Sequence, residues 1–330
     1  MKKILSYLFE HKTLSREQAK EVLINIGKGL YNEHEITAFM TVFLMRSISI
    51  EELQGFRLAL LDLCLPVELG IKDAIDIVGT GGDGKNTFNI STLSCFIVAG
   101  AGQPVIKHGN YGASSISGSS NVMEALGYKF KTDNNKLKTE VKETGLCFLH
   151  APLFHPALKI VAPIRKNLAM RTFFNMLGPL VNPASPAYRL IGVFNLEMAR
   201  LYNYLLQEDE KPFTIIHNLD GYDEISLTAD ARLITREGEK VMSAEELGKR
   251  SVLPQDIYGG STVTESAKIF QKILSGNGSW AQNAVVMANA ATALDCMGKY
   301  GSYQEAYDAA VESFESGKAL KSFGTLIDMQ

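Results

Sequence analysis

The stretch Asp76-Ile-Val-Gly-Thr-Gly-Gly-Asp-Gly-Lys-Asn-Thr-Phe-Asn-Ile-Ser-Thr92 decides how the rest of the chain is interpreted. It begins in the apolar run 74–78, which is short enough for a buried strand, and it leads into the helix-like apolar run 93–101. Four glycines lie within positions 79–84 and are followed by Thr87, Asn89, Ser91 and Thr92. Glycines let backbone N–H groups approach a ligand, and a helix N-terminus adds partial positive charge. The stretch therefore predicts a strand, an anion-binding turn and a helix.

The glycine pattern fits neither common nucleotide-binding motif well. A Walker loop needs Ser or Thr after Gly-Lys, and here Asn86 follows Gly84-Lys85. Residues 79–84 match the letters G-x-G-x-x-G, but the acidic residue expected about 20 residues later at the end of a second strand is missing. Asp83 would repel a pyrophosphate unless a cation or a sugar hydroxyl lay between them. We therefore interpret the loop as a site for a phosphorylated sugar and a divalent cation.

The composition of the chain is that of an ordinary globular protein. Of its 330 residues, 46% are hydrophobic and 21% charged, and the net charge of −3 does not favour nucleic-acid binding. The apolar run in residues 1–10 is too short for a signal peptide, and no window has the length of a membrane span. The four cysteines are scattered without a C-x-x-C pair, which indicates free thiols in a reducing compartment. We expect a cytoplasmic protein that binds neither nucleic acid nor membranes.

The order of the expected elements predicts two domains. Residues 1–70 contain only helical patterns, with capping signals at Ser15, Gln18 and Ser49. From Asp76 on, strands alternate with helices, which favours a mainly parallel sheet. The fold class is therefore α/β, with a small all-helical N-terminal domain at 1–70 and a large α/β domain at 71–330. Beyond the opening stretch, we expect strands at 103–107, 189–194, 213–217, 231–236 and 240–242, the last two as a hairpin. We expect helices at 122–126, 197–206, 243–247, 265–274, 281–297, 304–316 and, as a packed amphipathic tail, 320–329.

A second polar loop, 107–121, follows the strand expected at 103–107. In parallel sheets ligands bind at the carboxyl ends of strands, so this loop should lie beside the glycine loop. Lys107 at the strand end is a natural phosphate partner, whereas His108 is better explained as a packing or lining group. The serines that could bond phosphate oxygens, some of them only turn or cap residues, are Ser114, Ser115, Ser117, Ser119 and Ser120.

Charged groups elsewhere complete the candidate site. Asp223 and Glu224 follow the strand expected at 213–217, and two adjacent carboxylates there suit Mg²⁺, which prefers oxygen ligands. Arg165 lies between apolar runs, where a guanidinium suits a planar carboxylate on a ring; a helix-surface arginine explains it equally well. His150 and His155 adjoin prolines or proline-containing turns, and we interpret both as structural.

Taken together, these motifs resemble the anthranilate phosphoribosyltransferase family over nearly the whole chain. The matching motifs are Gly79-Thr-Gly-Gly-Asp83, Asn89-Ile-Ser-Thr92, Lys107-His-Gly-Asn110, Gly118-Ser119, Glu124-Ala-Leu-Gly127, His155-Pro156, Pro163-Ile-Arg165, Arg171-Thr172, Phe174-Asn175, Leu177-Gly-Pro-Leu180, Asn182-Pro183 and Asp223-Glu224. The resemblance implies a homodimer that associates through the helical domains. It also implies that part of 165–183 returns to the helical domain.

The resemblance also assigns roles to single residues. The activity it implies is transfer of a phosphoribosyl group from phosphoribosyl pyrophosphate to the amine of anthranilate, in tryptophan biosynthesis. Phosphoribosyl pyrophosphate would contact Gly79, Gly82, Asp83, Thr87, Asn89, Ile90, Ser91, Thr92, Lys107 and Ser119. Magnesium would be held by Ser91, Asp223 and Glu224, and anthranilate would contact Gly79, Asn110 and Arg165. Catalysis would depend on Lys107, Asp223 and Glu224.

Two departures from the family pattern fall in the second loop. Tyr111 stands where relatives often have arginine, and Ser120-Asn121 replaces a frequent Ala-Asp. Three other functions compete with this one: a pyrimidine nucleoside phosphorylase, a non-catalytic relative that binds nucleic acid, and a dinucleotide-binding oxidoreductase. The Arg165 region opposes the first, and the net charge with the intact Asp223-Glu224 pair opposes the second. The third depends only on the glycine pattern at 79–84.

Overall fold

The computed structural model describes residues 1–112 and 115–330, which form two compact units. The helical unit comprises Met1–Val67 and Ala151–Ser185, and the α/β unit comprises Glu68–His150 and Pro186–Gln330. Ser114, one of the serines considered for phosphate binding, lies outside the described residues.

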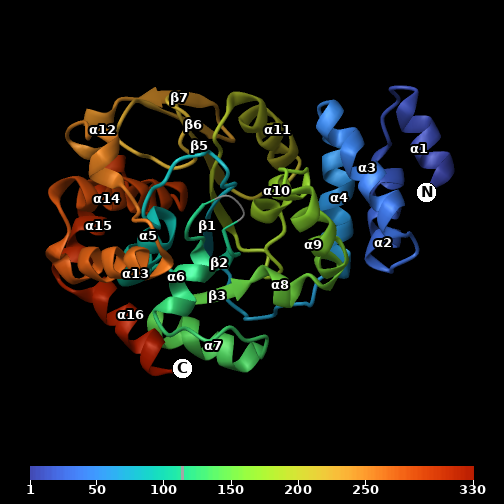
Figure 1. Cartoon of the computed structure of the whole chain (residues 1–330). Coiled ribbons are helices and arrows are strands. Elements are labelled where there is room, and N and C mark those ends of the chain that lie inside the picture. The colour runs from blue at the N-terminus through green and yellow to red at the C-terminus, as the bar shows by residue number, and fades with distance from the viewer. Residues whose placement is uncertain (113–114) are drawn as a thin grey trace. The chain divides into compact units, whose positions relative to one another are not determined.

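The helical unit is built from two segments of the chain (Figure 1). Its elements are α1 (Lys2–Phe9), α2 (Arg16–Gly27), α3 (Glu33–Met45), α4 (Ile50–Leu63), α8 (Ala151–Phe154), α9 (Pro156–Leu168), α10 (Phe174–Leu177) and the 3₁₀ turn η1 (Gly178–Leu180). The capping boxes predicted at Ser15 and Ser49 are confirmed at the starts of α2 and α4. Each satisfies N–H groups that the first helical turn leaves without partners.

An aromatic cluster joins the two segments of the helical unit. Phe173 of the second segment stacks on Phe56 of α4, with ring centroids 4.5 Å apart. Phe43 of α3 meets the ring of Phe173 edge to face at 5.0 Å, and all three side chains are buried. Aromatic pairs of this geometry contribute roughly 0.5–1.5 kcal/mol beyond the area they bury. The returning segment is therefore part of the core of this unit.

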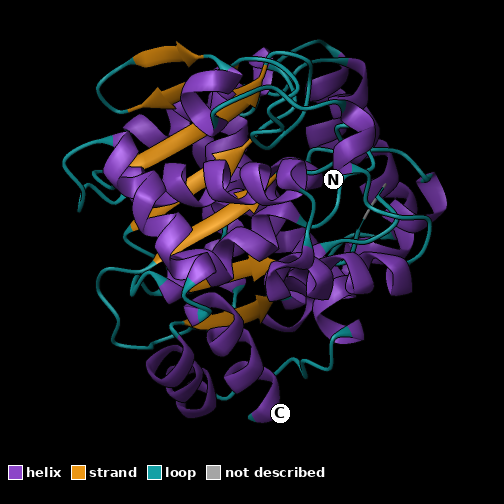
Figure 2. Cartoon of the chain, turned by 90° about the vertical axis from the view of Figure 1, so that its left-hand side faces the viewer, coloured by secondary structure: helices purple, strands orange, loops and turns teal. Residues whose placement is uncertain are grey.

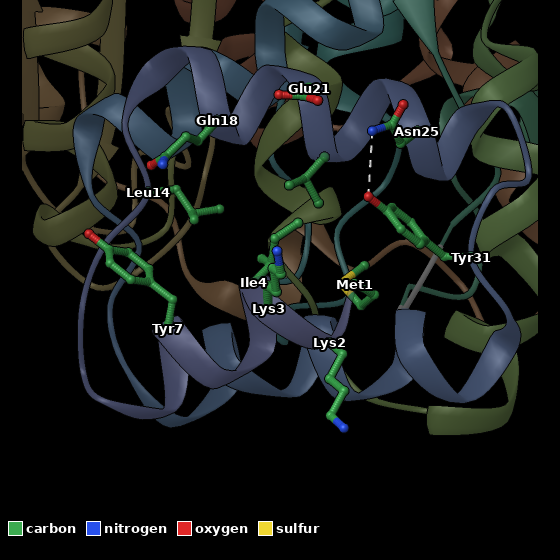
Figure 3. Close-up of a pocket in the computed structure, with 11 residues that line it drawn as sticks. Met1, Lys2, Lys3, Ile4, Tyr7, Leu14, Gln18, Glu21, Asn25 and Tyr31 are labelled. Atoms are coloured by element: carbon green, nitrogen blue, oxygen red, sulfur yellow. Dashed lines mark hydrogen bonds between the residues drawn. The ribbon is translucent and has the colours of Figure 1, made fainter.

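The surface of the helical unit has a cavity of about 650 Å³ between α1 and α2 (Figure 3). Tyr7, Leu14 and Tyr31 line it, and the Asn25 amide donates to the Tyr31 hydroxyl at 3.5 Å. Four large apolar side chains of this unit are also more than half exposed: Phe9 (62%), Leu30 (64%), Met45 (83%) and Met170 (59%). The unit thus presents apolar surface to its surroundings.

A seven-stranded sheet forms the centre of the α/β unit (Figure 2). Its strands are β1 (Ile75–Gly79), β2 (Val105–Gly109), β3 (Leu146–His150), β4 (Tyr188–Gly192), β5 (Phe213–Asn218), β6 (Ala231–Thr235) and β7 (Glu239–Met242). Their order is β3-β2-β1-β4-β5-β6-β7. The first five strands in this order are parallel, while β6 and β7 form the predicted hairpin. The mainly parallel sheet is confirmed.

Helices supply the rest of the core of the α/β unit. They are α5 (Ile90–Gly100), α6 (Ser119–Ala125), α7 (Asn134–Thr144), α11 (Leu196–Gln207), α12 (Ala244–Gly248), α13 (Val263–Lys272), α14 (Trp280–Cys296), α15 (Tyr303–Glu315) and α16 (Lys318–Asp328), with the turns η2 (Pro254–Ile257) and η3 (Ile273–Asn277). α5 packs against β1 and α14, and nearly all of its residues are buried, which explains its uninterrupted apolar run. α11 packs against β5 and β6. No helix among the described residues has an apolar stretch that could cross a membrane.

Most of the elements predicted in the α/β unit are confirmed, with shifts at their ends. α6 starts at Ser119 instead of at 122, because Gly118 caps it and polar residues fill its first turn. The helix expected at 265–274 ends in the one-turn π-helix η3, where Gly276 has a φ of +81°. β3 was not predicted, although all five of its residues are buried against neighbouring elements.

Candidate active site

The two polar loops lie side by side at the carboxyl ends of β1 and β2, as predicted. These strands are neighbours in the sheet. The Asn89 amide, just before α5, donates to the carbonyl of Ser117 in the second loop at 2.9 Å. This bond joins the two loops directly at the sheet edge.

The glycine loop needs its glycines for conformational reasons. Gly81, Gly82 and Gly84 have φ values of +64°, +77° and +75°, which side chains rarely tolerate. With no Cβ atoms, this backbone can present its N–H groups to a ligand, as the sequence predicted.

A distant segment fixes the end of the glycine loop. The Phe88 N–H donates to the Ile257 carbonyl at 3.3 Å, and the Gly259 N–H donates to the Asn86 carbonyl at 2.9 Å. The Asn86 amide returns a bond to the Gly260 carbonyl at 2.8 Å. Residues 257–260 thus hold the part of the loop that carries Thr87 and Asn89. No local pattern in the sequence indicated this contact.

Asp223 lies against the paired ends of β1 and β4. Gly79 and Gly192 are partners in register at these ends. A Cβ atom on Gly79 would overlap the Asp223 carboxylate, and a Cβ atom on Gly192 would overlap the Asp223 carbonyl oxygen. The Gly81 N–H donates to Asp223 Oδ2 at 2.6 Å. The carboxylate is therefore held against the glycine loop by backbone contacts on both sides.

Glu224 contacts the start of α5. Its Oε1 accepts a hydrogen bond of 2.8 Å from the backbone N–H of Ser91, the second residue of that helix. The partial positive charge of a helix N-terminus favours an anion at this place. The acidic turn 221–224 and the helix start are thus joined directly.

Burial raises the pKa values of three carboxyl groups around the glycine loop. Burial raises the pKa of Asp223 to about 7, helped by the nearby charge of Asp83. Burial also raises the pKa of Glu224 to about 8, with Asp223 as the next cause. The pKa of Asp83 is raised as well, again mainly by burial. The charge of Asp83 disfavours ionisation of Asp223 and Glu224, and the charge of Asp223 disfavours ionisation of Glu224, so a cation is stabilised at this place.

The donor set fits Mg²⁺ that also binds a phosphorylated ligand. In the part of the chain that the structure describes, no group of three or more His, Cys, Asp or Glu side chains has the arrangement of a complete metal site. Mg²⁺ is commonly held by one or two carboxylates and completes its coordination with water and substrate phosphates. Asp223 and Glu224, with hard oxygen donors and raised pKa values, meet that requirement.

Lys107 is not at the end of its strand, so this prediction is wrong. β2 continues to Gly109, because His108 and Gly109 still pair with Leu149 and His150 of β3. The Lys107 side chain is 2% exposed, and its Nζ donates to the Ile77 carbonyl of β1 at 2.6 Å. Its positive charge lowers the pKa of Glu224, against the stronger effect of burial. Lys107 therefore acts on the site as a buried cation near the acidic pair.

Several buried side-chain oxygens of the two loops have no hydrogen-bond partner among the described residues. They are Thr80 Oγ1, Asn89 Oδ1, Thr92 Oγ1 and Ser117 Oγ. Buried polar atoms are satisfied in the great majority of cases, so each such exception needs an explanation. Their concentration in the predicted binding loops fits a polar ligand with many oxygen atoms.

Arg165 belongs to the helical unit, on α9. Its guanidinium lies over the Phe174 ring, 5.6 Å from the centroid, and donates to Asn175 Oδ1 at 3.4 Å. Burial lowers the pKa of this guanidinium. The two contacts orient the planar group without using its full set of donors, which leaves capacity for a carboxylate.

The two histidines interpreted as structural are both buried. A hydrogen bond of 2.9 Å joins His155 Nε2 to the Val181 carbonyl within the helical unit, and burial lowers the pKa of His155 to about 4. His150 ends β3 and bonds to Ser120. The buried His108 donates its backbone N–H to Asp76 at 3.1 Å, consistent with a packing role.

The fold and the site define a transferase of sugar groups. Residues 71–320 match the model of the "Glycosyl transferase family, a/b domain", and residues 2–64 match that of the "Glycosyl transferase family, helical bundle domain". The chain belongs to this glycosyltransferase family and is a pentosyltransferase enzyme. Among its curated relatives are proteins named anthranilate phosphoribosyltransferase. That of Flavobacterium johnsoniae is 56% identical over 100% of this chain and 99% of its own length, and that of Bacteroides thetaiotaomicron is 52% identical over the same shares.

Solved structures lead to the same group of enzymes. The crystal structure of anthranilate phosphoribosyltransferase from Thermus thermophilus has a TM-score of 0.91 and 30% identity, covering 98% of each chain. The Saccharomyces cerevisiae enzyme, in complex with phosphoribosyl pyrophosphate and magnesium, has a TM-score of 0.87 and 26% identity over 96% of this chain and 93% of its own. The family resemblance predicted from the sequence motifs is confirmed.

Proposed function

We propose that this enzyme transfers the phosphoribosyl group of phosphoribosyl pyrophosphate to the amine of anthranilate. The products are N-(5'-phosphoribosyl)anthranilate and pyrophosphate, and the step belongs to tryptophan biosynthesis. The observation that carries the proposal is the set of three carboxyl groups around the glycine loop, at the carboxyl end of a parallel sheet. The full-length relatives support the choice of substrates.

The donor substrate is assigned to the two loops of the α/β unit. Its phosphate oxygens accept hydrogen bonds from the N–H groups of the glycine loop and from side-chain hydroxyls. The hydroxyls of Thr92 and Ser117 suit this role, because their oxygens have no hydrogen-bond partner among the described residues. The proposed contacts are Gly79, Gly82, Asp83, Thr87, Asn89, Ile90, Ser91, Thr92, Lys107 and Ser119. Lys107 contributes as a buried charge, because its amine already donates to the backbone of β1.

Magnesium is assigned to Asp223, Glu224 and Ser91. When bound, it supplies Lewis-acid stabilisation of the charge that develops on the departing pyrophosphate. The glycine-loop N–H groups add fixed dipoles that need no reorganisation during the reaction. The neutral amine of anthranilate needs positioning more than activation, so the chain need not supply a strong base.

The direct test mixes the protein with anthranilate, phosphoribosyl pyrophosphate and Mg²⁺. Loss of anthranilate fluorescence reports turnover, and omission of any component should abolish it. Uridine or thymidine with phosphate serves as the control for a nucleoside phosphorylase. Cleavage of a nucleoside with no consumption of anthranilate would contradict the proposed function.

Arg165 is proposed as the partner of the anthranilate carboxylate, and Gly79 and Asn110 are also assigned to this substrate. We expect Arg165→Ala to raise the KM for anthranilate at least about tenfold, since a charge-assisted pair contributes roughly 1.5–3 kcal/mol. Arg165→Lys should not restore it, because an ammonium lacks the planar fork. Lys166→Ala on the same helix is the matched control. Steady-state kinetics with each substrate varied separately measures the effect, and an unchanged KM for anthranilate would remove Arg165 from the site.

The acidic pair should make stability depend on pH and Mg²⁺. The pKa values of Asp223 and Glu224 rise from 3.8 and 4.5 to about 7 and about 8. The folded state therefore binds these protons more tightly, so the stability they contribute is fully present below about pH 4 and is lost as the pH rises through about 7 and about 8. Mg²⁺ should restore it most at the alkaline end, by about 2.7 kcal/mol at a hundredfold excess over Kd. Thermal unfolding across this range, with and without Mg²⁺, measures the effect. An equal Mg²⁺ shift at both ends would contradict it.

We also propose a cytoplasmic homodimer that associates through the helical unit. The exposed side chains of Phe9, Leu30 and Met45 supply apolar surface for association. The described structure contains four cysteines without a disulfide, consistent with a reducing compartment.

A further inference from the structure

The second loop is closed by the start of α6. The Asn110 carbonyl accepts from the Ser120 N–H at 3.1 Å and from the Ser119 hydroxyl at 3.4 Å. Asn121 Oδ1 accepts from the N–H groups of Gly112 and Gly118 at 2.9 and 3.0 Å. Asn110 and Ser119, which the proposed function assigns to the two substrates, are therefore held next to each other across the neck of this loop.

Tyr111 anchors the loop from its other side by ring contacts. Its ring meets that of His150 edge to face, with centroids 4.8 Å apart and planes at 73°. It also meets Phe130 at 6.5 Å and 87°, while Phe130 stacks on His150 at 4.3 Å. The Tyr111 side chain is nevertheless 43% exposed, so burial alone does not explain its position.

His150 connects the two sides of the loop. A hydrogen bond of 2.8 Å joins its Nδ1 to the Ser120 hydroxyl, and both side chains are buried. Burial lowers the pKa of His150 to about 4, so its ring is neutral near pH 7. The backbone of His150 also pairs with that of Gly109, the last residue of β2. The His150 imidazole thus contacts Ser120 at the start of α6 and the Tyr111 ring in the loop, while the His150 backbone pairs with Gly109 at the end of β2.

We propose that Tyr111 is a positioning residue that holds Asn110 and Ser119 in their binding geometry by packing its ring on His150 and Phe130. The inference rests on the proposed function, which assigns Asn110 to anthranilate and Ser119 to the phosphoribosyl donor. The two places where the sequence departs from the family pattern, Tyr111 and Ser120, meet at the same histidine. They form one anchor for the loop.

The ring of Tyr111, not its hydroxyl, carries this role. The hydroxyl lies 3.5 Å from Glu124 Oε2, at the outer limit of a hydrogen bond. Edge-to-face contacts depend on the ring, which phenylalanine retains. Without the ring, the free enzyme can populate other conformations of the loop. The apparent affinity for the substrates then falls in proportion to the fraction of enzyme in the binding-competent conformation. Once both substrates are bound, the loop is ordered again, so kcat should change little.

The test compares Tyr111→Ala with Tyr111→Phe, and with Tyr204→Ala as an exposed tyrosine of α11. We expect Tyr111→Ala to raise KM for both substrates by roughly three- to tenfold. Its kcat should stay near that of the wild type. Tyr111→Phe and Tyr204→Ala should behave as the wild type. Hydrogen exchange should accelerate in peptides covering 108–121 of Tyr111→Ala only.

Two results would overturn the proposed role of Tyr111. Wild-type KM values in Tyr111→Ala overturn the inference, as does Tyr111→Phe behaving like Tyr111→Ala. Tyr111→Leu, which keeps apolar bulk without the ring, replaces Tyr111→Ala if that variant unfolds, with the same expected KM. The wild-type enzyme is assayed first: a wild type that does not consume anthranilate refutes the proposed function, whereas normal kinetics in the variants refutes only the role of Tyr111.

Discussion

The double variant Asp223→Asn/Glu224→Gln is expected to lose turnover by about a thousandfold, in the range seen when a group that stabilises transition-state charge is removed. Both substitutions keep the shape of the side chains but remove the negative charges assigned to magnesium. The substitutions leave the backbone unchanged, so the Asp223 backbone can still pack against Gly192, which has no side chain. A lower turnover at saturating anthranilate, donor and Mg²⁺ is therefore caused by the lost negative charges and not by misfolding.

The same double variant separates chemistry from stability. Removing two acids whose pKa values are raised by burial should leave the protein at least as stable as the wild type at alkaline pH without Mg²⁺. The stabilisation by Mg²⁺ should disappear. Glu237→Gln/Glu239→Gln in the exposed β6–β7 hairpin removes the same charge and is the matched control. Near-normal turnover in the acidic-pair variant would take magnesium out of the proposed site.

The sequence was sufficient to predict features determined by neighbouring residues. The capping boxes at Ser15 and Ser49 are local hydrogen-bond patterns, and both are present. The strand, glycine turn and helix around 76–100 were recognisable because a buried parallel strand and a buried helix each leave a continuous apolar run. The acidic pair was recognisable because two adjacent carboxylates lie in a turn that follows a strand.

Features determined by long-range contacts could not be predicted in this way. The segment 257–260 fixes the glycine loop through bonds between residues up to 174 positions apart. The sequence indicates Lys107 as the end of the strand expected at 103–107, yet β2 continues to Gly109 and the Lys107 amine donates to the Ile77 carbonyl of β1. β3 is not among the predicted strands, and its place at the edge of the sheet is set by pairing with β2. Such contacts depend on the assembled sheet.

The role of Gly192 illustrates the same limit and leads to the second large effect. In the sequence it is a glycine inside the strand expected at 189–194, with no sign of a role in the site. In the structure it is the neighbour of Gly79 in register, and the Asp223 backbone occupies the space that its side chain would need. A methyl group there must displace Asp223, because the atom it meets is a backbone carbonyl oxygen and not a flexible side chain.

Gly192→Ala is therefore expected to reduce kcat about a hundredfold, the effect associated with a displacement of about 1 Å at a reacting centre. Overpacking should also lower the free energy of unfolding by about 1–3 kcal/mol. Gly324→Ala is the matched control: Gly324 lies within α16, where a Cβ atom meets nothing within 4 Å, so the change should raise stability by up to about 1 kcal/mol without altering kcat. Thermal unfolding, turnover and Mg²⁺ titration of the two variants make the comparison. A Gly192→Ala enzyme with normal turnover and a normal Mg²⁺ response would show that Asp223 need not lie against the ends of β1 and β4 for the site to function.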